Sequence, residues 1–293
     1  MDFMDEFQSY YDKYSYEKNF PQELVEKYII LKCLKHTGDC ETLLIKERNT
    51  EKKAVAKCYT KDSFFYDKEE AEELKNIGSS VLPRFEGEYK NSGYRCICRE
   101  YIEGVPLDEY MINTHISSGM VENIAIGLAA TMKSLHDLKP PIIHRDIKPS
   151  NIIIKKDGSV ALIDFGISRV SKENGMSDTF CYGTKGFAPP EQFGFMQTDV
   201  CSDIYSFGIV LSWMLTGKVE AITNPSSRLE KVAARCCRFS PNQRYHNDRA
   251  LMHALNRTTK KFTLHAQKVV YVVVFLFTAF AAAAAARAAV QKE

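Results

Sequence analysis

The densest run of chemically capable side chains is HRDIKPSN at residues 144–151, followed after a short apolar segment by DFG at residues 164–166. Asn151 and Asp164 offer amide and carboxylate oxygens, which hard cations such as Mg²⁺ prefer as ligands. A single aspartate in such a segment is an ordinary turn residue as often as it is a catalytic one. The interpretation therefore depends on the two motifs occurring together, in this order and at this separation.

Together, the two motifs resemble the catalytic loop and the metal-binding turn of the protein kinase family. The reaction of that family requires a hydroxyl aligned with the γ-phosphorus of ATP and neutralised charge on the phosphate oxygens. The resemblance implies that Asp146 accepts and orients the proton of the substrate hydroxyl and that Lys148 lies against the γ-phosphate. It also implies that Asn151 and Asp164 hold Mg²⁺, with Mn²⁺ as an alternative cation.

An earlier lysine agrees with this resemblance. In AVAKCY, Lys57 matches the strand lysine that contacts the α- and β-phosphates of ATP in the family. Its partner is expected to be a glutamate one turn before an apolar residue on the following helix, and Glu70 fits best. Three nearby glutamates stay open as alternatives: Glu69, Glu72 and Glu73.

Farther along the chain, GTKGFAPPEQF at residues 183–193 resembles the substrate-docking segment of the family, with Glu191 in its APE-like end. By the same resemblance, Asp203 braces the catalytic loop from a buried helix, and Arg244 pairs with Glu191. The match covers about residues 28–256. By the same resemblance, Lys148 and the GT at residues 183–184 are features of Ser/Thr-directed members, so Ser and Thr are the expected acceptors. The PEQ and SDIYSFG sequences are most similar to the bacterial members called eukaryotic-like Ser/Thr kinases.

The phosphate-covering loop departs from the family pattern GxGxxG, whose glycines let backbone N–H groups approach the phosphates. Lys35, Thr37 and Cys40 stand where glycines are expected, and only Gly38 remains. Asp39 adds a negative charge near this site unless it turns outward. A weaker or differently shaped phosphate clamp follows, which is the main argument for a pseudokinase.

The segment expected to bind adenine is also unusual. Arg99 stands at the position that gates the pocket behind adenine, which is usually apolar. A snorkelling or ion-paired arginine is the ordinary explanation. The following hinge, from Glu100 to Ile102, is expected to bond the adenine edge through its backbone.

The resemblance extends to regulation. Arg145 precedes Asp146, and kinases with that arginine are often activated when a phosphate in the segment beyond Gly166 pairs with it. Thr179 is the predicted principal site, phosphorylated between neighbouring copies of the chain. Thr184 is expected instead to contact the catalytic aspartate and lysine.

The patterns around these motifs predict the elements that position them. Apolar runs between Tyr28 and Tyr59, separated by turn residues, predict an antiparallel meander. The other expected elements are a helix over 67–77, strands over 82–89 and 94–101, and helices over 121–138 and 202–216. Between Gly217 and Arg244 the chain is shorter than in typical kinases, so a helix there is expected to be reduced.

The C-terminal segment is strongly apolar. Val269 to Ala286 carries no charge and would span about 27 Å as a helix, close to the thickness of a bilayer core. Its flanks predict a basic linker over 259–268 and a single transmembrane helix over 269–290, with the kinase part cytoplasmic. A buried or coiled alanine-rich helix is the alternative interpretation.

Composition excludes some classes of protein. The net charge of +2 over 293 residues is too small to indicate a nucleic-acid partner. The nine cysteines lack the paired spacing of a zinc site and are interpreted as reduced thiols. The first twenty residues are acidic and tyrosine-rich, without the apolar run of a secretory signal.

We therefore expect an α+β, bilobal kinase fold: an N-terminal extension over residues 1–20, a sheet lobe over 21–101 and a helical lobe over 102–258, with ATP in the cleft between the lobes. The expected function is phosphorylation of Ser or Thr in protein substrates, with transient homodimers for self-phosphorylation at a membrane. A pseudokinase scaffold is the alternative. A small-molecule kinase is disfavoured because the segment over 183–193 would dock a peptide.

Overall fold

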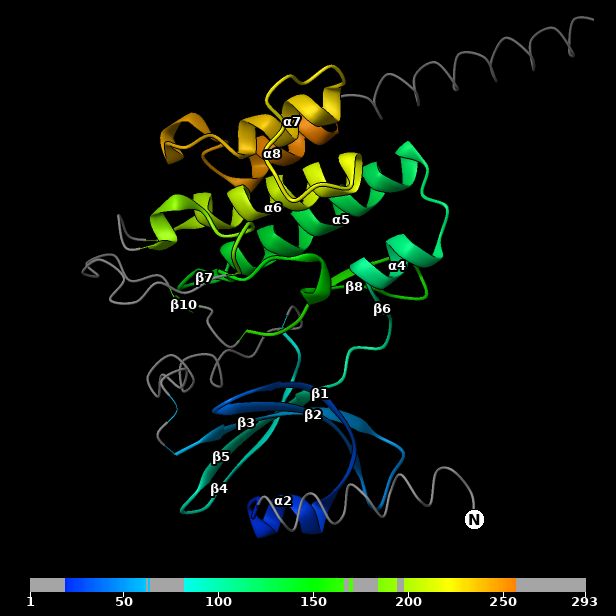
Figure 1. Ribbon diagram of the computed structural model, residues 1–293, viewed down its shortest axis with the longest axis vertical. Helices are drawn as coiled ribbons and strands as arrows, with labels where there is room; N and C mark the ends of the chain where they lie inside the picture. The colour runs from blue at the N-terminus through cyan, green and yellow to red at the C-terminus, as the bar shows by residue number, and fades with distance from the viewer. Residues whose placement is uncertain are drawn as a thin grey trace, which may run out of the picture.

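The computed structural model describes residues 19–61, 63, 82–165, 169–170, 184–193 and 198–256. They form two lobes, one built on a β-sheet and one mainly helical (Figure 1). The expected bilobal α+β architecture is confirmed. The predicted helix over 67–77 and the predicted membrane span over 269–290 lie outside the described residues. Within the described part of the chain, no helix is both long and apolar enough to cross a bilayer.

The N-terminal lobe is an antiparallel five-stranded sheet with a short helix before it. In spatial order the strands are β1 (Tyr28–Thr37), β2 (Cys40–Glu47), β3 (Lys53–Thr60), β5 (Tyr94–Glu100) and β4 (Phe85–Lys90), and the helix is α2 (Gln22–Lys27). The first three strands pair in sequence, so the predicted meander is confirmed. The sequence patterns do not predict α2, because its six residues are too few to show helical periodicity.

One face of this sheet is packed with apolar side chains from alternate positions, as the pleat of a strand requires. Leu43, Ile45 and Ala56 are completely buried there. Cys58 on β3 and Cys96 on β5 lie opposite each other on this face and form a disulfide. The prediction that all the cysteines are reduced thiols is therefore wrong for this pair. Its members are 38 residues apart in sequence, and only the strand register brings them together.

The C-terminal lobe is built from helices and short strands. The helices are α4 (Leu107–Asn113), α5 (Ser118–His136), α6 (Val200–Thr216), α7 (Arg228–Cys236) and α8 (Asp248–Leu255), with 3-10 turns η1 (Pro149–Asn151), η2 (Pro190–Phe193) and η3 (Pro241–Gln243). The strands are β6 (Val105–Pro106), β7 (Ile142–Ile143), β8 (Ile152–Ile154), β9 (Val160–Leu162) and β10 (Arg169–Val170). Helices α5 and α6 confirm the helices predicted over 121–138 and 202–216, whereas no sequence pattern predicts α4.

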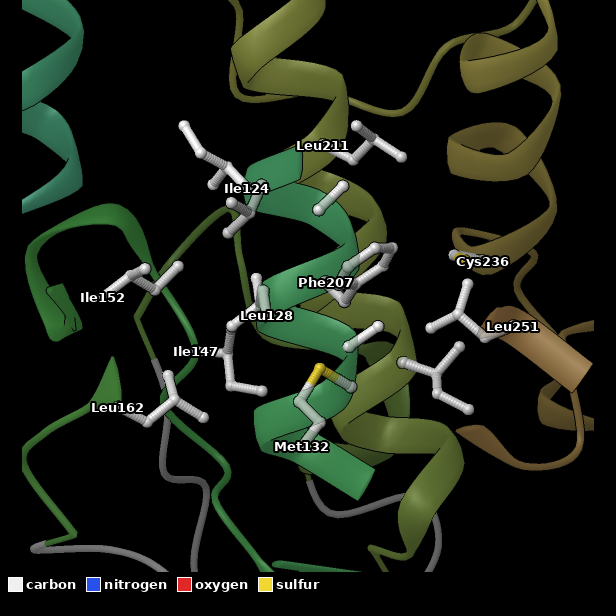
Figure 2. Close-up of a cluster of buried hydrophobic side chains, with 14 of the residues drawn as sticks. Ile124, Leu128, Met132, Ile147, Ile152, Leu162, Phe207, Leu211, Cys236 and Leu251 are labelled. Atoms are coloured by element: carbon white, nitrogen blue, oxygen red, sulfur yellow. The ribbon is translucent and has the colours of Figure 1, made fainter. Parts of the chain in front are cut away.

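Helices α5 and α6 form the centre of this lobe (Figure 2). Leu128 and Met132 of α5 and Phe207 of α6 are completely buried. Ile147 and Ile152, which come from the segment carrying the HRD motif, join the same cluster. The polar residues between these two isoleucines are therefore held against the helical core, because moving the segment would expose apolar surface to water.

The chain after α6 takes a short path to α7. Helix α6 ends at Gly217, whose φ of 74° gives the left-handed C-cap that favours glycine. Residues 217–227, all of which are described, contain no helix, in agreement with the predicted reduction of a helix in this region. Helix α7 packs closely on α6 at Gly208, where an added Cβ would lie 2.5 Å from Cβ of Cys236.

Candidate active site

Asp146 is at the centre of a network of short hydrogen bonds. Its Oδ2 accepts from Lys148 Nζ at 2.6 Å and from Asn151 Nδ2 at 2.9 Å. Its Oδ1 accepts from Thr184 Oγ1 at 2.7 Å, and Lys148 Nζ lies 2.7 Å from the same hydroxyl. The structure thus brings together the three predicted residues of the catalytic loop and the threonine of the docking segment. The carboxylate is held in one orientation beside a lysine charge.

A second ion pair joins the two lobes. Lys57 Nζ on β3 lies 2.5 Å from Oδ1 of Asp164. Burial alone would lower the pKa of Lys57 and raise the pKa of Asp164, but the attraction between the two charges outweighs it. The pKa of Lys57 is raised and the pKa of Asp164 is lowered. Both groups therefore stay ionised at neutral pH.

The histidine of the HRD motif links the catalytic loop to the segment that ends in Asp164. His144 is completely buried, and its ring lies 4.7 Å from the ring of Phe165, centroid to centroid. Its Nε2 is 3.1 Å from the carbonyl oxygen of Ile163, and its Nδ1 accepts from the Asp146 N–H at 3.3 Å. Burial lowers the pKa of His144. These contacts fit a neutral imidazole with its proton on Nε2.

Asp203 of α6 holds the backbone of the catalytic loop. Its Oδ2 accepts from the His144 N–H at 2.7 Å, and its Oδ1 accepts from the Arg145 N–H at 2.9 Å. His136, at the end of α5, places Nε2 3.0 Å from Asp203 Oδ2 and Nδ1 2.7 Å from Asp248 Oδ2. Burial would lower the pKa of His136, but its bonds to the two carboxylates raise it to about 9. The imidazole therefore bridges α6 and α8, and the two carboxylates favour its protonated form.

Two residues of the site have a left-handed backbone conformation, which residues other than glycine rarely adopt. Arg145 has φ 66° and Asp164 has φ 63°. The peptide groups on both sides of Arg145 are fixed, since its N–H donates to Asp203 at 2.9 Å and its carbonyl accepts from Gln192 Nε2 at 2.6 Å. Such strain persists where the surroundings impose it, and it is concentrated at functional sites.

The docking segment is attached to the helical lobe by a buried ion pair. Arg244 donates from Nη1 to Oε1 of Glu191 at 2.6 Å and from Nη2 to Oε2 at 2.9 Å. Ser202 Oγ donates to the same Oε1 at 3.0 Å. The side chains of the pair are 0% and 1% exposed, so removing either partner would leave a buried charge without its counterion. The pairing anticipated from sequence is present in the structure.

The residues expected to bind a cation offer suitable oxygens. Asn151 donates through Nδ2 to the carbonyl and carboxylate of Asp146, and its Oδ1 accepts no hydrogen bond within the described residues. Oδ1 of Asp164 accepts from Lys57. Its Oδ2 accepts no hydrogen bond within the described residues, so it is available to bind a cation. One amide oxygen and one carboxylate fit Mg²⁺, which completes its coordination shell with water and substrate phosphates.

A paired hairpin stands where a glycine-rich loop was expected. Strands β1 and β2 pair as far as Thr37 and Cys40, so that only Gly38 and Asp39 form the turn. The Asp39 carboxylate is turned toward the end of β3, because its Oδ2 accepts from Ser63 Oγ, just beyond that strand, at 2.9 Å. Its charge is therefore engaged at the end of β3.

The predicted adenine-binding segment follows β5. Arg99 lies opposite Val55 of β3, and its Nη1 donates to the carbonyl oxygen of Pro83 at 3.2 Å. Burial lowers the pKa of Arg99. Glu100 ends the strand and its N–H donates to the Arg84 carbonyl at 2.8 Å, whereas the Ile102 N–H forms no backbone hydrogen bond within the described residues. An available amide at Ile102 suits a contact with an adenine edge.

The match between predicted and observed site residues is incomplete in both directions. Six predicted residues lie outside the described part of the chain: Glu70, its alternatives Glu69, Glu72 and Glu73, and also Gly166 and Thr179. A partner for Lys57 on the following helix therefore stays a prediction. Three residues that support the site are not predicted from sequence: His136, Gln192 and Ser202. Their only signal is that each lies close to a motif in sequence.

An antiparallel sheet lobe, a helical lobe and a lysine–aspartate pair between them define a bilobal kinase fold. The chain belongs to the family described as the protein kinase domain, whose model matches residues 37–263. The match covers most of the chain and includes the catalytic loop, the docking segment and the helices behind them.

Curated relatives agree with this assignment. The chain is 28% identical over 279 residues to serine/threonine-protein kinase D of Synechocystis, covering 80% of this chain and 52% of that protein. It is 28% identical over 249 residues to a probable serine/threonine-protein kinase of Clostridium acetobutylicum, covering 76% and 37%. It is 30% identical over 241 residues to dual specificity protein kinase zak2 of Dictyostelium discoideum, covering 77% and 35%. The chain spans about half or less of the length of these relatives.

Proposed function

We propose that this chain is an ATP-dependent protein kinase that transfers the γ-phosphoryl group to Ser or Thr hydroxyls of protein substrates. The observation that carries the proposal is the network in which Asp146 bonds Lys148, Asn151 and Thr184. The network connects the candidate base to the lysine that would face the transferred phosphoryl group, to a candidate metal ligand and to the peptide-docking segment. A scaffold without catalysis would not need these four side chains in contact.

Each residue has a distinct task in the proposed reaction. Asp146 orients the incoming hydroxyl and accepts its proton, while Lys148 stabilises negative charge on the phosphoryl group in transit. Lys57 contacts the inner phosphates from β3, and Asn151 and Asp164 hold Mg²⁺. Bound Mg²⁺ neutralises charge on the phosphate oxygens. Because the side chains are already fixed by neighbours, little reorganisation is needed when the substrate arrives.

The choice of acceptor rests on Lys148 and Thr184. The lysine lies between the Asp146 carboxylate and the Thr184 hydroxyl, so these three residues act as one unit at the place where the acceptor enters. By resemblance, this combination is typical of Ser/Thr-directed kinases. The dual-specificity name of one relative makes tyrosine the acceptor to test against.

A pseudokinase remains the second candidate because of one observation, the hairpin with Lys35, Thr37 and Cys40 in place of glycines. A sheet paired to its tip leaves fewer free backbone N–H groups for phosphates than a glycine-rich loop does. The scaffold would still bind nucleotide through Lys57 and the hinge. The two candidates therefore differ in transfer, not in binding.

The decisive experiment measures phosphate incorporation from labelled ATP with Mg²⁺, into the full chain itself and into a generic basic protein, followed by identification of the phosphorylated amino acids. Asp146→Asn should reduce incorporation by about 10²- to 10⁴-fold, as expected for loss of a general base. Asp157→Asn is the matched control, because Asp157 is an exposed loop residue that only accepts from Ser159.

Incorporation on Ser or Thr that is lost in Asp146→Asn and kept in Asp157→Asn would support the proposal. Equal incorporation by all three proteins would assign the activity to a contaminant. Absence of incorporation from a wild-type protein that binds ATP would favour the scaffold.

We extend the proposal to the parts of the chain that the structure does not describe. The kinase domain spans residues 21–258, a basic linker spans 259–268, and residues 269–290 anchor the protein in a membrane as a single span, with the kinase domain on the cytoplasmic side. Thr179 is phosphorylated between neighbouring copies. Phosphopeptide mapping and alkaline extraction of membranes test these points. An unmodified Thr179 in active protein, or full release at alkaline pH, would contradict them.

A further inference from the structure

Lys35 shares a row of the sheet with Lys57. In the register of the strands, Lys35 of β1 lies opposite Thr42 of β2, and Thr42 lies opposite Lys57 of β3. Directly opposed residues of antiparallel strands project from the same face of a sheet. The two lysines therefore project from one face, separated by two strand spacings or about 10 Å between backbones.

That face is the one turned toward the helical lobe. Lys57 reaches Asp164 from it at 2.5 Å. The next residue along β1 projects from the other face, where His36 Nδ1 lies 3.4 Å from Oε1 of Glu41 on β2. The register shifts between Cys33 and Lys35, but from Lys35 to Thr37 each residue of β1 lies opposite one residue of β2, so the direction of Lys35 follows from its pairing with Thr42.

Lys35 is an exposed residue, and its ammonium group has no hydrogen-bond or ion-pair partner within the described residues. Burial opposes ionisation of the candidate metal ligand Asp164, but the pKa of its carboxyl is lowered. Most of the lowering comes from Lys57, and the positive charge of Lys35 is close enough to contribute to it. An unpaired cation facing a site built for Mg²⁺ and phosphates has an anionic ligand as its natural partner.

We propose that Lys35 binds the phosphate groups of ATP and takes over, by its side chain, the role that backbone N–H groups of a glycine-rich loop would fill. The hairpin brings the lysine to the site without needing the flexibility of glycine, since the backbone from Lys35 to Thr37 is paired with β2. A lysine contacts phosphate as a point charge, so the contact tolerates a stiff backbone. The inference rests on the proposed function only in taking ATP as the ligand.

The experiment is equilibrium binding of MgATP, MgADP and adenosine to the full chain and to three variants. Lys35→Ala removes the charge, and Lys35→Arg keeps it. Lys90→Ala is the control, because Lys90 is an exposed lysine at the end of β4 with no side-chain hydrogen bond or ion pair among the described residues. Thermal unfolding of each variant checks that the fold is intact.

We expect Lys35→Ala to bind MgATP about 10-fold more weakly, in the range measured for loss of one hydrogen bond to a charged group. Lys35→Arg and Lys90→Ala should stay within about two-fold of wild type, and adenosine should bind all four proteins alike because it carries no phosphate. The loss should shrink as salt is added, since a solvent-exposed charge contact is screened.

Unchanged MgATP affinity in Lys35→Ala would overturn the inference, and so would an equal loss of ATP and adenosine affinity, which would indicate a general change in the site. Wild-type protein that fails to bind MgATP would also overturn it. These outcomes are independent of catalysis. A chain that binds ATP through Lys35 but transfers no phosphate would keep this inference while the proposed kinase activity fails.

Discussion

The catalytic loop and the β1–β2 hairpin lie on opposite sides of the candidate nucleotide site and are held in place in different ways. The loop is largely buried, with His144 0% exposed and Arg145 and Asn151 each 5% exposed, and the carboxylate of Asp203 accepts from two of its backbone amides. The hairpin tip is exposed from Leu34 to Gly38 and is held by strand pairing. One region depends on particular side chains, and the other on main-chain bonds that any sequence can make.

This difference explains why the sequence departs from the family pattern in one region and keeps it in the other. Buried polar groups that lose a partner are costly, because water cannot replace it. The loop residues therefore cannot be exchanged one at a time. The hairpin can replace glycines with Lys35, Thr37 and Cys40, because pairing does not require glycine. The tests below should show large effects around the loop and small ones at the hairpin.

The largest effect is expected at the buried ion pair beneath the docking segment. Arg244→Met should lower the free energy of unfolding by about 3–5 kcal/mol, because Glu191 would remain buried without its counterion. Urea denaturation measures the change. Arg238→Met is the control, since Arg238 has an exposed side chain. The double variant Arg244→Met with Glu191→Gln should lose less than the sum of the single losses, and strict additivity would show that the two residues are not coupled.

The next effect is on catalysis rather than stability. Thr184→Val removes the hydroxyl that bonds both Asp146 and Lys148. We expect phosphoryl transfer to fall by about 10²-fold, because the base loses part of its positioning, while the free energy of unfolding changes by only about 1 kcal/mol. Thr184→Ser keeps the hydroxyl and should restore most of the rate. Mapping of phosphosites should show no site lost with Thr184.

A pH dependence is expected from the brace behind the loop. The pKa of His136 is raised to about 9 by Asp203 and Asp248, above its ordinary unfolded value of about 6.5. The stabilisation is therefore fully present below about pH 6.5 and is lost as pH rises through about 9. Unfolding midpoints measured from pH 6 to pH 10 should fall by an amount corresponding to about 1–3 kcal/mol more in wild type than in His136→Gln. Parallel profiles would show that His136 is not charged in the folded protein.

The smallest effect should come from the hairpin. Asp39→Ala removes the bond from Ser63 Oγ and should change the free energy of unfolding by less than about 1 kcal/mol, because water can satisfy both groups. Asp199→Ala serves for comparison, since Asp199 caps α6 and its loss is expected to cost about 1–2 kcal/mol. A larger loss at Asp39 than at Asp199 would contradict the contrast between the two regions.

Sequence patterns predict the parts of this fold that local chemistry determines. The meander over β1–β3 and the helices α5 and α6 are each marked by their own period and by turn residues such as Gly217. The motif residues could be placed in order because the resemblance fixes both their types and their spacing. These features need no knowledge of how distant segments pack.

Features that depend on long-range register could not be predicted. Cys58 meets Cys96 only because β3 and β5 pair in one register. His136 meets Asp248 across 112 residues of sequence, through the packing of α5 on α8. The direction of Asp39 stayed open in sequence because it depends on where Ser63 lies after β3. In each case the type of one residue does not indicate the contact, because the position of its partner is known only from the folded structure.

The left-handed backbone at Arg145 and Asp164 has an evolutionary consequence. A sequence selected for stability alone would relax position 145, since glycine or asparagine adopts this conformation with less strain than arginine does. A lineage released from catalysis would therefore be expected to drift toward such residues and gain stability as its activity decayed. This chain has an arginine and an aspartate there, so it retains at Arg145 a conformation that costs stability.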